Sequence, residues 1–340
     1  MVENTVRTAL LASLVALIVF FPVLYGCALT GSPPVGGERT ATEEPSSAGP
    51  AAAHETEAAG AAAMLDGGRS LQQRVFIVHP SPRNAEEQRS KMHAVGCQLD
   101  RSGTKSAECA FGDPSSETTV VLFGDSHAML WFPALNEIAK ERNWRLVGLT
   151  KSACPPAEVH RYIRSLGREY SECDAWRERT LERIIHEERP QMVVTSMNSN
   201  YQVMRDGKRL GRRAGVRTLE EGYVSTLEKL RSTGAEVVAI NDIPHPDKDI
   251  PECVSRSRDH LQDCATPRGK ALDYPQVNAG AAARARGAHF IDPTPLLCLE
   301  RVCPAVIGDV LVYRNGAHLT ATYVRTLTPW LAKQLPELTG

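Results

Sequence analysis

The sequence lacks an excess of charge of either sign. Its 340 residues include 39 Lys and Arg against 40 Asp and Glu, which leaves a formal net charge of −1. A net charge near zero gives no argument for a nucleic-acid or acidic-polymer partner, so we predict neither. Internal repeats are absent too, and the length allows one large domain with appendages or two small domains.

Aromatic residues and metal-binding motifs are also scarce. Aromatic residues make up 6% of the chain and hydrophobic residues 42%, which is ordinary for a globular α/β protein. No two cysteines have Cys-x-x-Cys spacing, and no histidine stands in a finger-like register. We therefore predict no metal site, and we expect no cofactor.

The N-terminal residues form an apolar run. Residues 8–24 are uncharged and almost wholly apolar, with Arg7 before them. The run is long for a secretion signal and slightly short for a spanning helix. Residues 24–27 resemble a bacterial lipobox in which Cys27 would be lipidated, although Tyr25 fits that motif poorly, and an uncleaved anchor is the favoured alternative. We expect residues 1–27 to be a signal or membrane-anchor segment, with the body of the protein on the extracytoplasmic side of a bacterium.

Nine cysteines are present, and eight remain once Cys27 is set aside. An even set in an exported chain indicates disulfides, although sequence alone leaves many connectivities open. The spacing favours four consecutive short loops. The expected pairs are Cys97–Cys109, Cys154–Cys173, Cys253–Cys264 and Cys298–Cys303.

Composition and periodicity divide the chain further. Residues 28–70 are rich in small and polar residues and are predicted to be a flexible linker. Residues 71–117 are predicted to be a loop-rich lead-in stapled by a disulfide, and residues 118–340 the main domain. In that domain short hydrophobic runs alternate with helical patterns, which predicts an α/β fold with one doubly wound, mostly parallel sheet of about five strands. The expected strands are 118–123, 145–150, 191–195, 236–240 and 288–291, and the expected helices cover 129–139, 173–188, 219–232, 275–287 and 320–334.

Ser126 lies at a turn between a buried strand and an amphipathic helix. In that position its hydroxyl would project from the sheet beside the free N–H groups of the helix, as a serine nucleophile requires. The alternative is that Asp125 or Ser126 merely caps the helix. Lys151, Asn198 and Asp242 also follow strands closely and would meet at the same sheet edge, which favours the nucleophile.

A serine nucleophile needs a base, and His318 is the best of the ten histidines. It lies in a loop just before the final predicted helix. His127 adjoins Ser126 in sequence, but neighbouring side chains at a sharp turn seldom face each other. His289 lies in a strand pattern and is interpreted as a packed or surface residue.

Several stretches together resemble a known family. They are VVLFGDSHAMLWFPAL, LTKSACPP, NDIPHPDKDIPECV, LLCLERVC and VYRNGAHLT, in that order over about residues 95–335. The chain resembles the SGNH (GDSL-like) hydrolase superfamily, and more narrowly the extracytoplasmic SGNH domains fused to bacterial acyltransferase-3-type membrane O-acyltransferases. The G-x-S-x-G elbow of the α/β-hydrolases is absent, because Ala128 replaces its second glycine. The resemblance implies a flavodoxin-like three-layer α/β/α fold and ester chemistry on envelope glycans.

The resemblance also implies roles for individual residues. Ser126 is the expected nucleophile and lends its N–H to the oxyanion hole, where Ala153 replaces the usual glycine. Asn198, or less securely Asn200, is the expected oxyanion asparagine. His318 is the expected base, but Asn315 stands where the family has the Asp of its D-x-x-H motif. Three alternatives follow: Asp309 or Asp292 supplies the charge, the site works as a slow Ser-His dyad, or the domain has kept binding without catalysis.

The sequence therefore predicts an exported serine esterase or O-acyltransferase. Its substrates would be acyl esters of cell-envelope polysaccharide, with acetyl as the favoured acyl group. The reaction would pass through an acyl-enzyme on Ser126. The alternative is a non-catalytic glycan-binding module that works with a separate membrane acyltransferase. A metallophosphoesterase using Asp125 and His127 is disfavoured, because further ligand blocks are not apparent.

Overall fold

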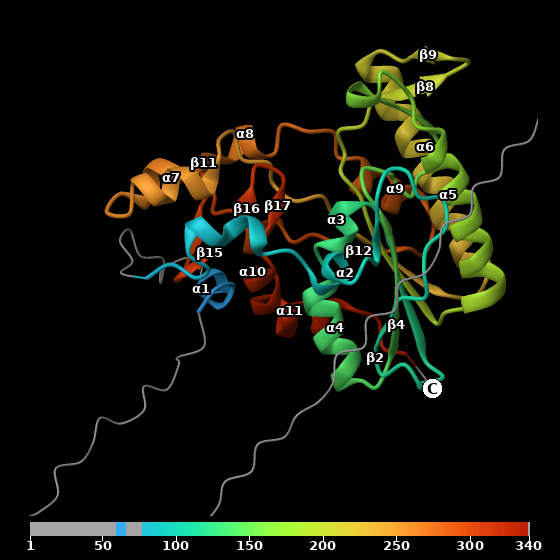
Figure 1. The fold of residues 1–340 in the computed structure, drawn as a ribbon, viewed down its shortest axis with the longest axis horizontal. Helices are drawn as coiled ribbons and strands as arrows, with labels where there is room; N and C mark the ends of the chain where they lie inside the picture. Colours follow the sequence, from blue (N-terminus) through green and yellow to red (C-terminus); the bar gives the residue numbers. More distant parts are fainter. Residues whose placement is uncertain (1–58, 66–76, 339–340) are drawn as a thin grey trace, which may run out of the picture. The chain divides into compact units, whose positions relative to one another are not determined.

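The computed structural model describes residues 59–65 and 77–338 (Figure 1). The predicted signal or anchor segment, Cys27 and most of the predicted linker lie outside these residues. Residues 59–65 of that linker are not a free tether, because they form the short helix α1 (Ala62–Leu65) with buried Ala63 and Met64. The N–H of Ala61 donates to Oγ1 of Thr326 at 2.9 Å, which ties this segment to the C-terminal helices. Within the described ranges no helix is long and apolar enough to cross a membrane.

A sheet of seven strands forms the centre of the domain. Its order is β1-β4-β3-β7-β10-β12, with β2 antiparallel to β4 and all the other pairs parallel. The five predicted strands are confirmed as β3, β4, β7, β10 and β12. The strands are β1 (Gln98–Leu99), β2 (Ala110–Gly112), β3 (Thr119–Gly124), β4 (Arg145–Lys151), β5 (His160–Ile163), β6 (Arg168–Glu169), β7 (Met192–Ser196), β8 (Val203–Arg205), β9 (Lys208–Arg209), β10 (Glu236–Ile240), β11 (Thr266–Pro267), β12 (His289–Ile291), β13 (Val302–Cys303), β14 (Val306–Ile307), β15 (Val310–Leu311), β16 (Tyr313–Asn315) and β17 (His318–Leu319).

The two further strands of this sheet come from the predicted lead-in. Both pair with the free edge of β4, where β2 covers its first half and β1 its end. Two- and three-residue strands carry no readable period of their own, so the sequence indicated only a loop there. A second sheet, of order β6-β5-β8-β9, was not predicted either, because its strands are only two to four residues long.

Helices cover both faces of the central sheet, which confirms the three-layer α/β/α fold (Figure 1). The predicted first and last helices are each split in two. The helices after α1 are α2 (Lys91–Ala94), α3 (Ser126–Met129), α4 (Phe132–Glu141), α5 (Ser171–Glu182), α6 (Arg212–Arg231), α7 (Ile250–Arg256), α8 (Arg268–Ala271), α9 (Val277–Arg284), α10 (Ala321–Thr326) and α11 (Thr328–Gln334).

The core is divided between the two faces of the sheet. Along β3 the side chains alternate: Val120 and Leu122 pack towards α4, α10 and α11, whereas Val121 and Phe123 pack towards α5, α6 and α9. Every residue of β3 is buried. Burial on both faces explains why the strands appear in the sequence as continuous apolar runs without a polar alternation.

The eight cysteines pair as predicted, in the bonds Cys97–Cys109, Cys154–Cys173, Cys253–Cys264 and Cys298–Cys303. The first bond lies beside β1 and β2 and so holds both short strands to the edge of β4. The second joins the loop after β4 to α5.

The strand order places the candidate site. The sequence β4-β3-β7-β10-β12 is the 2-1-3-4-5 order of flavodoxin-like sheets, and its switch point lies between β3 and β7. Gly124 pairs with Ser196 and with Thr150, so β3, β7 and β4 end at the same level. The loops that begin at Ser126, Asn198 and Ala153 therefore leave one edge of the sheet together.

Candidate active site

The turn from β3 to α3 is shaped by its glycine and its aspartate. Gly124 has φ +147°, and a Cβ there would lie 2.4 Å from the carbonyl oxygen of Ser196, so only glycine fits. Asp125 caps the helix, because its Oδ1 accepts the N–H of His127 at 2.7 Å. The cap is therefore Asp125, which leaves the hydroxyl of Ser126 for other partners.

Ser126, His318 and Asn315 form a linear array. Nε2 of His318 lies 3.0 Å from Oγ of Ser126, and its Nδ1 lies 3.1 Å from Oδ1 of Asn315. The same Oδ1 accepts the N–H of Ala317 at 3.0 Å, which fixes the orientation of the amide. Nδ1 of His318 therefore carries the proton, and the lone pair of Nε2 faces the serine. This is the tautomer that a general base needs.

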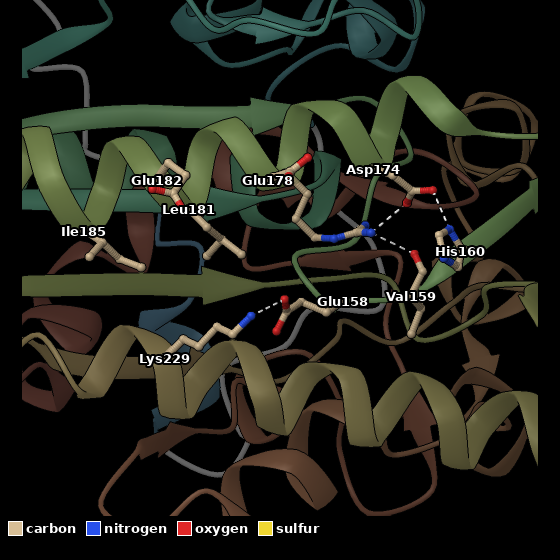
Figure 2. Close-up of a pocket in the computed structure, with 10 residues that line it drawn as sticks. Glu158, Val159, His160, Asp174, Glu178, Leu181, Glu182, Ile185 and Lys229 are labelled. Carbon is tan, nitrogen blue, oxygen red and sulfur yellow. Dashed lines mark hydrogen bonds and ion pairs between the residues drawn. The ribbon is translucent and has the colours of Figure 1, made fainter.

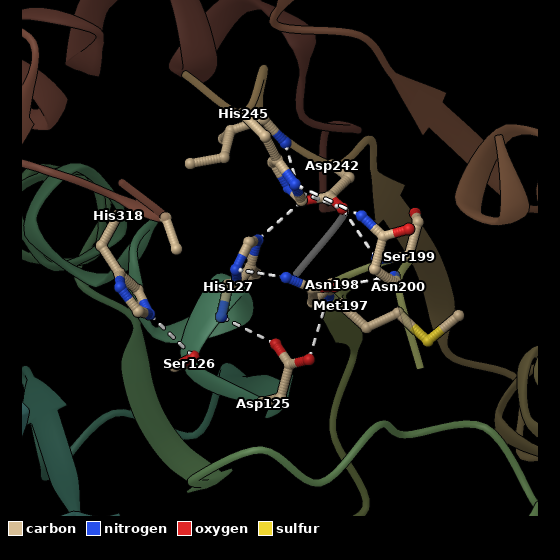
Figure 3. Close-up of polar contacts among 12 residues, drawn as sticks. Asp125, Ser126, His127, Met197, Asn198, Ser199, Asn200, Asp242, His245 and His318 are labelled. Atoms are coloured by element: carbon tan, nitrogen blue, oxygen red, sulfur yellow. Dashed lines mark hydrogen bonds and ion pairs between the residues drawn. The ribbon is translucent and has the colours of Figure 1, made fainter. Parts of the chain in front are cut away.

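The surroundings of His318 disfavour its charged form. Burial, followed by the nearby His127 and Arg314, lowers the pKa of His318 to about 2. Figure 3 shows the ring directed at Ser126 and away from the carboxylates of Asp125 and Asp242. The site has the positions of a triad, but within the described ranges the far side of the ring meets the amide of Asn315 and no anion.

The two carboxylates expected to replace the missing charge lie elsewhere. Asp292 accepts hydrogen bonds from the N–H and hydroxyl of Thr294 and from the amide of Asn241. Asp309 accepts the N–H of Ala59 at 3.1 Å. Among the described residues, neither carboxylate has a hydrogen bond or ion pair with His318. The expectation that one of them takes over is therefore wrong in this structure.

The predicted oxyanion residues follow β7 and β4. The N–H of Asn198 donates to Oδ2 of Asp125 at 2.9 Å, which ties the loop after β7 to the serine turn. Asn200 donates its N–H to Oδ1 of Asn198 at 2.7 Å, so it supports Asn198. Ala153 has φ +57°, a conformation that favours glycine, and its carbonyl accepts from the guanidinium of Arg161.

Comparison with known proteins gives the family. The model of the "SGNH domain (fused to AT3 domains)" matches residues 96–333, which is more than half of the chain. The chain belongs to this SGNH family. No curated protein sequence gives a significant match.

Two solved structures are similar to the chain. One is the periplasmic domain of a lipopolysaccharide acetyltransferase from Salmonella ser. Paratyphi A, which is 14% identical, with 66% of this chain and 85% of that chain covered and a TM-score of 0.50. The other is TesA, which is 17% identical, with 64% of this chain and 100% of that chain covered and a TM-score of 0.33. The first of these likenesses supports the SGNH fold.

The SGNH site also contains residues that the sequence analysis did not assign. Nδ1 of His127 lies 2.6 Å from Oδ1 of Asp242, and Nε2 of His245 lies 3.3 Å from its other oxygen. Figure 3 shows this cluster beside Ser126, with His127 lying between Asp242 and His318. The available signal was the position of Asp242 directly after β10, at the edge where Ser126 and Asn198 also lie.

In two groups of described side chains in the SGNH domain, the potential metal-ligand atoms lie close together. The groups are His127, Asp242 and His245, and His160, Glu169 and Asp174. Asp242 already accepts the backbone N–H groups of Ser199 at 2.7 Å and Ile243 at 2.9 Å, besides its bond to His127. The second group lies at the surface, with His160 bonded to Asp174 at 2.7 Å. We assign a metal to neither group.

A separate cavity of about 510 Å³ lies between α5 and α6 (Figure 2). Its charged side chains are largely paired with one another. Lys229 meets Glu158 at 2.5 Å, and Arg177 meets Asp174 at 2.6 Å. None of its lining residues belongs to the SGNH site, and we assign it no ligand.

Proposed function

We propose that the protein is an extracytoplasmic serine-dependent esterase or O-acyltransferase. Its substrates are acyl esters of cell-envelope polysaccharide, with acetyl as the favoured acyl group. The reaction passes through an acyl-enzyme on Ser126. The observation that carries the proposal is the array of hydroxyl, imidazole and amide, with Ser126 3.0 Å from a His318 ring that Asn315 holds in the basic tautomer.

Acylation begins when Oγ of Ser126 attacks the ester carbonyl carbon while its proton passes to Nε2 of His318. The carbonyl oxygen becomes an oxyanion. The N–H of Ser126, the N–H of Ala153 and the side-chain amide of Asn198 are the proposed donors to it. The tetrahedral intermediate collapses as the leaving alcohol takes the proton from His318, and the acyl group remains on Ser126.

Deacylation repeats these steps with a new nucleophile. His318 takes a proton from water or from a sugar hydroxyl, whose oxygen attacks the acyl carbon, and the proton then returns to Oγ of Ser126. Water gives hydrolysis, and a sugar hydroxyl gives acyl transfer. Asn315 orients the ring but carries no charge to stabilise the imidazolium that forms in both halves, so we expect slow turnover.

The substrate class and location are proposed from the family and the disulfides. The family is that of SGNH domains fused to AT3 domains, and the structural neighbour is named as a periplasmic domain of a lipopolysaccharide acetyltransferase. Four disulfides suit an oxidising compartment. We propose attachment to the membrane through residues 1–27, by an anchor helix or by lipidated Cys27, and an acyl supply from a separate membrane acyltransferase.

The direct test is hydrolysis of p-nitrophenyl acetate by the purified full-length protein and its Ser126→Ala variant. We expect the variant to lose activity by at least about 10³-fold, because no other group would attack the ester. Ser255→Ala, on the exposed face of α7, serves as the matched control and should keep the wild-type rate. Equal rates for wild type and Ser126→Ala would reject the serine mechanism.

The uncharged Asn315 favours a second candidate, a non-catalytic glycan-binding module that works with the membrane acyltransferase. This candidate predicts binding of acylated polysaccharide without turnover. A fluorophosphonate probe separates the two, because it reacts only with an activated serine. Covalent labelling of wild type at Ser126, read by peptide mass spectrometry, would reject the binding-only candidate.

A further inference from the structure

We propose that His127 and Asp242 are positioning residues that hold the amide of Asn198 as an oxyanion donor, and that protonation of His127 switches the site off in acid. This inference rests on the proposed function, because it assigns Asn198 to the oxyanion hole. It concerns a histidine that the serine–histidine mechanism itself does not use.

The contacts form a chain from a buried carboxylate to the oxyanion position. Asp242 is fully buried, and its Oδ1 lies 2.6 Å from Nδ1 of His127, whose side chain is also buried. The other ring nitrogen, Nε2, lies 3.0 Å from Nδ2 of Asn198. Figure 3 shows the three side chains in that order, directly beside Ser126.

The direction of each hydrogen bond follows from the backbone. Oδ1 of Asn198 accepts the N–H of Asn200 at 2.7 Å, so the NH₂ end of the amide faces His127. Nε2 of His127 must then accept, and its single proton must sit on Nδ1 and point at Asp242. One hydrogen of the Asn198 amide binds His127, and the second is left to donate to a developing oxyanion.

Protonation of His127 breaks this arrangement. A proton on Nε2 would face the NH₂ group of Asn198, donor against donor. The amide would have to rotate, which would break its bond to the N–H of Asn200, or the side chain would have to move away. Either change removes the aligned donor, and the loss of one oxyanion donor costs about 10²–10³ in turnover.

The charges around His127 favour its protonated form. Burial alone would lower the pKa of His127, but the charge and hydrogen bond of Asp242, with a further contribution from Asp125, raise it. Arg314 on β16 opposes this effect, and the rings of His245 and His318 lie 5.7 and 5.4 Å away. Burial, with His127 and Arg314, instead lowers the pKa of His318, so a falling pH protonates His127 before His318.

The pH dependence of turnover tests the inference. We would measure kcat and KM for p-nitrophenyl acetate between pH 4 and 9 with the full-length wild type, His127→Gln and Ser126→Ala. Glutamine offers an oxygen to Asn198 and an NH₂ to Asp242 but does not titrate in this range. We expect wild-type kcat to fall at least tenfold on the acid side with KM little changed. The acid limb should be missing in His127→Gln.

Control variants separate this outcome from its alternatives. His245→Gln alters the neighbour of Asp242 that does not touch Asn198, and it should keep the wild-type acid limb. Asn198→Ala should lower kcat by about 10²–10³ at pH 8. An acid limb that persists in His127→Gln, or that disappears in His245→Gln, would overturn the inference. A Ser126→Ala variant as active as the wild type would instead overturn the proposed function.

A spectroscopic readout keeps the test decisive if His127→Gln does not fold. In wild type with ¹⁵N-labelled histidine, the short bond from Nδ1 of His127 to Asp242 should give a far-downfield proton resonance. The ¹⁵N shift of Nε2 should titrate with the same midpoint as kcat. A His127 that titrates away from the kcat midpoint, or a midpoint shared with His318, would reject the switch.

Discussion

Oδ1 of Asn315 lies 3.1 Å from Nδ1 of His318 and 3.0 Å from the N–H of Ala317, so one neutral oxygen serves both donors. The backbone N–H holds the amide with its oxygen towards the ring. The proposed base therefore has the correct tautomer but no charge behind it. Asn315 thus occupies the position of the triad's acidic residue without carrying its negative charge.

The first prediction is that Asn315→Asp raises activity. A carboxylate can accept from both His318 and Ala317 and would stabilise the imidazolium. In the serine-protease template the reverse change costs roughly 10⁴, partly through the wrong tautomer. Because the tautomer is already correct here, we expect a smaller gain in kcat, about 10- to 100-fold, measured with p-nitrophenyl acetate.

A matched control for this gain is Asn200→Asp, which adds the same charge to the neighbouring loop without touching His318. It should not raise kcat. An Asn315→Asp variant that is as slow as the wild type, or slower, would show that the missing charge does not limit turnover.

The second prediction concerns the glycine before the serine turn. Gly124→Ala would place a Cβ 2.4 Å from the carbonyl oxygen of Ser196 and would keep φ in a region unfavourable to alanine. We expect a loss of about 3 kcal/mol or more in the free energy of unfolding. Gly167→Ala is the control, because Gly167 also has positive φ but has no atom within 4 Å of the position that a Cβ would take.

Gly167→Ala should cost only about 1 kcal/mol, the backbone part of the effect. Urea unfolding of both variants measures the difference. Equal losses would show that the approach of β3 to β7 at Gly124 is not tight.

The sequence predicted the parts of the site that depend on local order. A β-branched run, a glycine and an apolar helix face placed Ser126 at the end of β3, and the D-x-x-H spacing placed Asn315 behind His318. The bond between Asn315 and His318 could be anticipated because they lie three positions apart, facing each other across one β-hairpin. The orientation of the amide could not, since it depends on the N–H of Ala317.

The pairing of His127 with Asp242 could not be predicted, because it joins residues 115 positions apart. Adjacency of Ser126 and His127 correctly argued against a direct contact between them. It did not reveal that His127 points the other way, towards the end of β10. The short strands β1 and β2 were missed because their pairing with β4 determines them, and their own residues show no period.

The third prediction concerns the disulfide next to Ala153. Cys154 and Cys173 are fully buried, and their bond closes a loop of 19 residues directly after the proposed oxyanion residue. Replacing both by alanine should lower the free energy of unfolding by about 3 kcal/mol. We also expect kcat/KM to fall more than tenfold, because the loop then no longer holds the N–H of Ala153 in place.

The control is the double alanine variant of Cys253 and Cys264, a bond with a sequence separation of 11 in the α7 region. Its stability loss should be similar, about 3 kcal/mol, with kcat/KM within a few-fold of wild type. Assays at a temperature well below both midpoints compare folded enzymes. Equal losses of activity in the two variants would contradict the oxyanion role of the loop.

The fourth prediction is that His318 makes the protein less stable in acid. Burial, with His127 and Arg314, lowers the pKa of His318 to about 2 in the folded state, whereas an unfolded histidine has a pKa near 6.5. Between these values the unfolded chain binds the proton and the folded chain does not. The free energy of unfolding therefore decreases as the pH falls below about 6.5.

Urea unfolding at pH 7 and pH 4.5 measures this loss in wild type and His318→Gln. Since the ring is partly exposed, we expect roughly 1–2 kcal/mol less acid destabilisation in the variant, below the full linkage value. His127, whose pKa is raised, contributes to the acid dependence of stability with the opposite sign. It does so in wild type and in His318→Gln alike, so subtracting one stability loss from the other removes its contribution. His186→Gln, at an exposed position, should lose as much stability as wild type. If His318→Gln loses as much stability as His186→Gln, the folded-state pKa of His318 is not depressed.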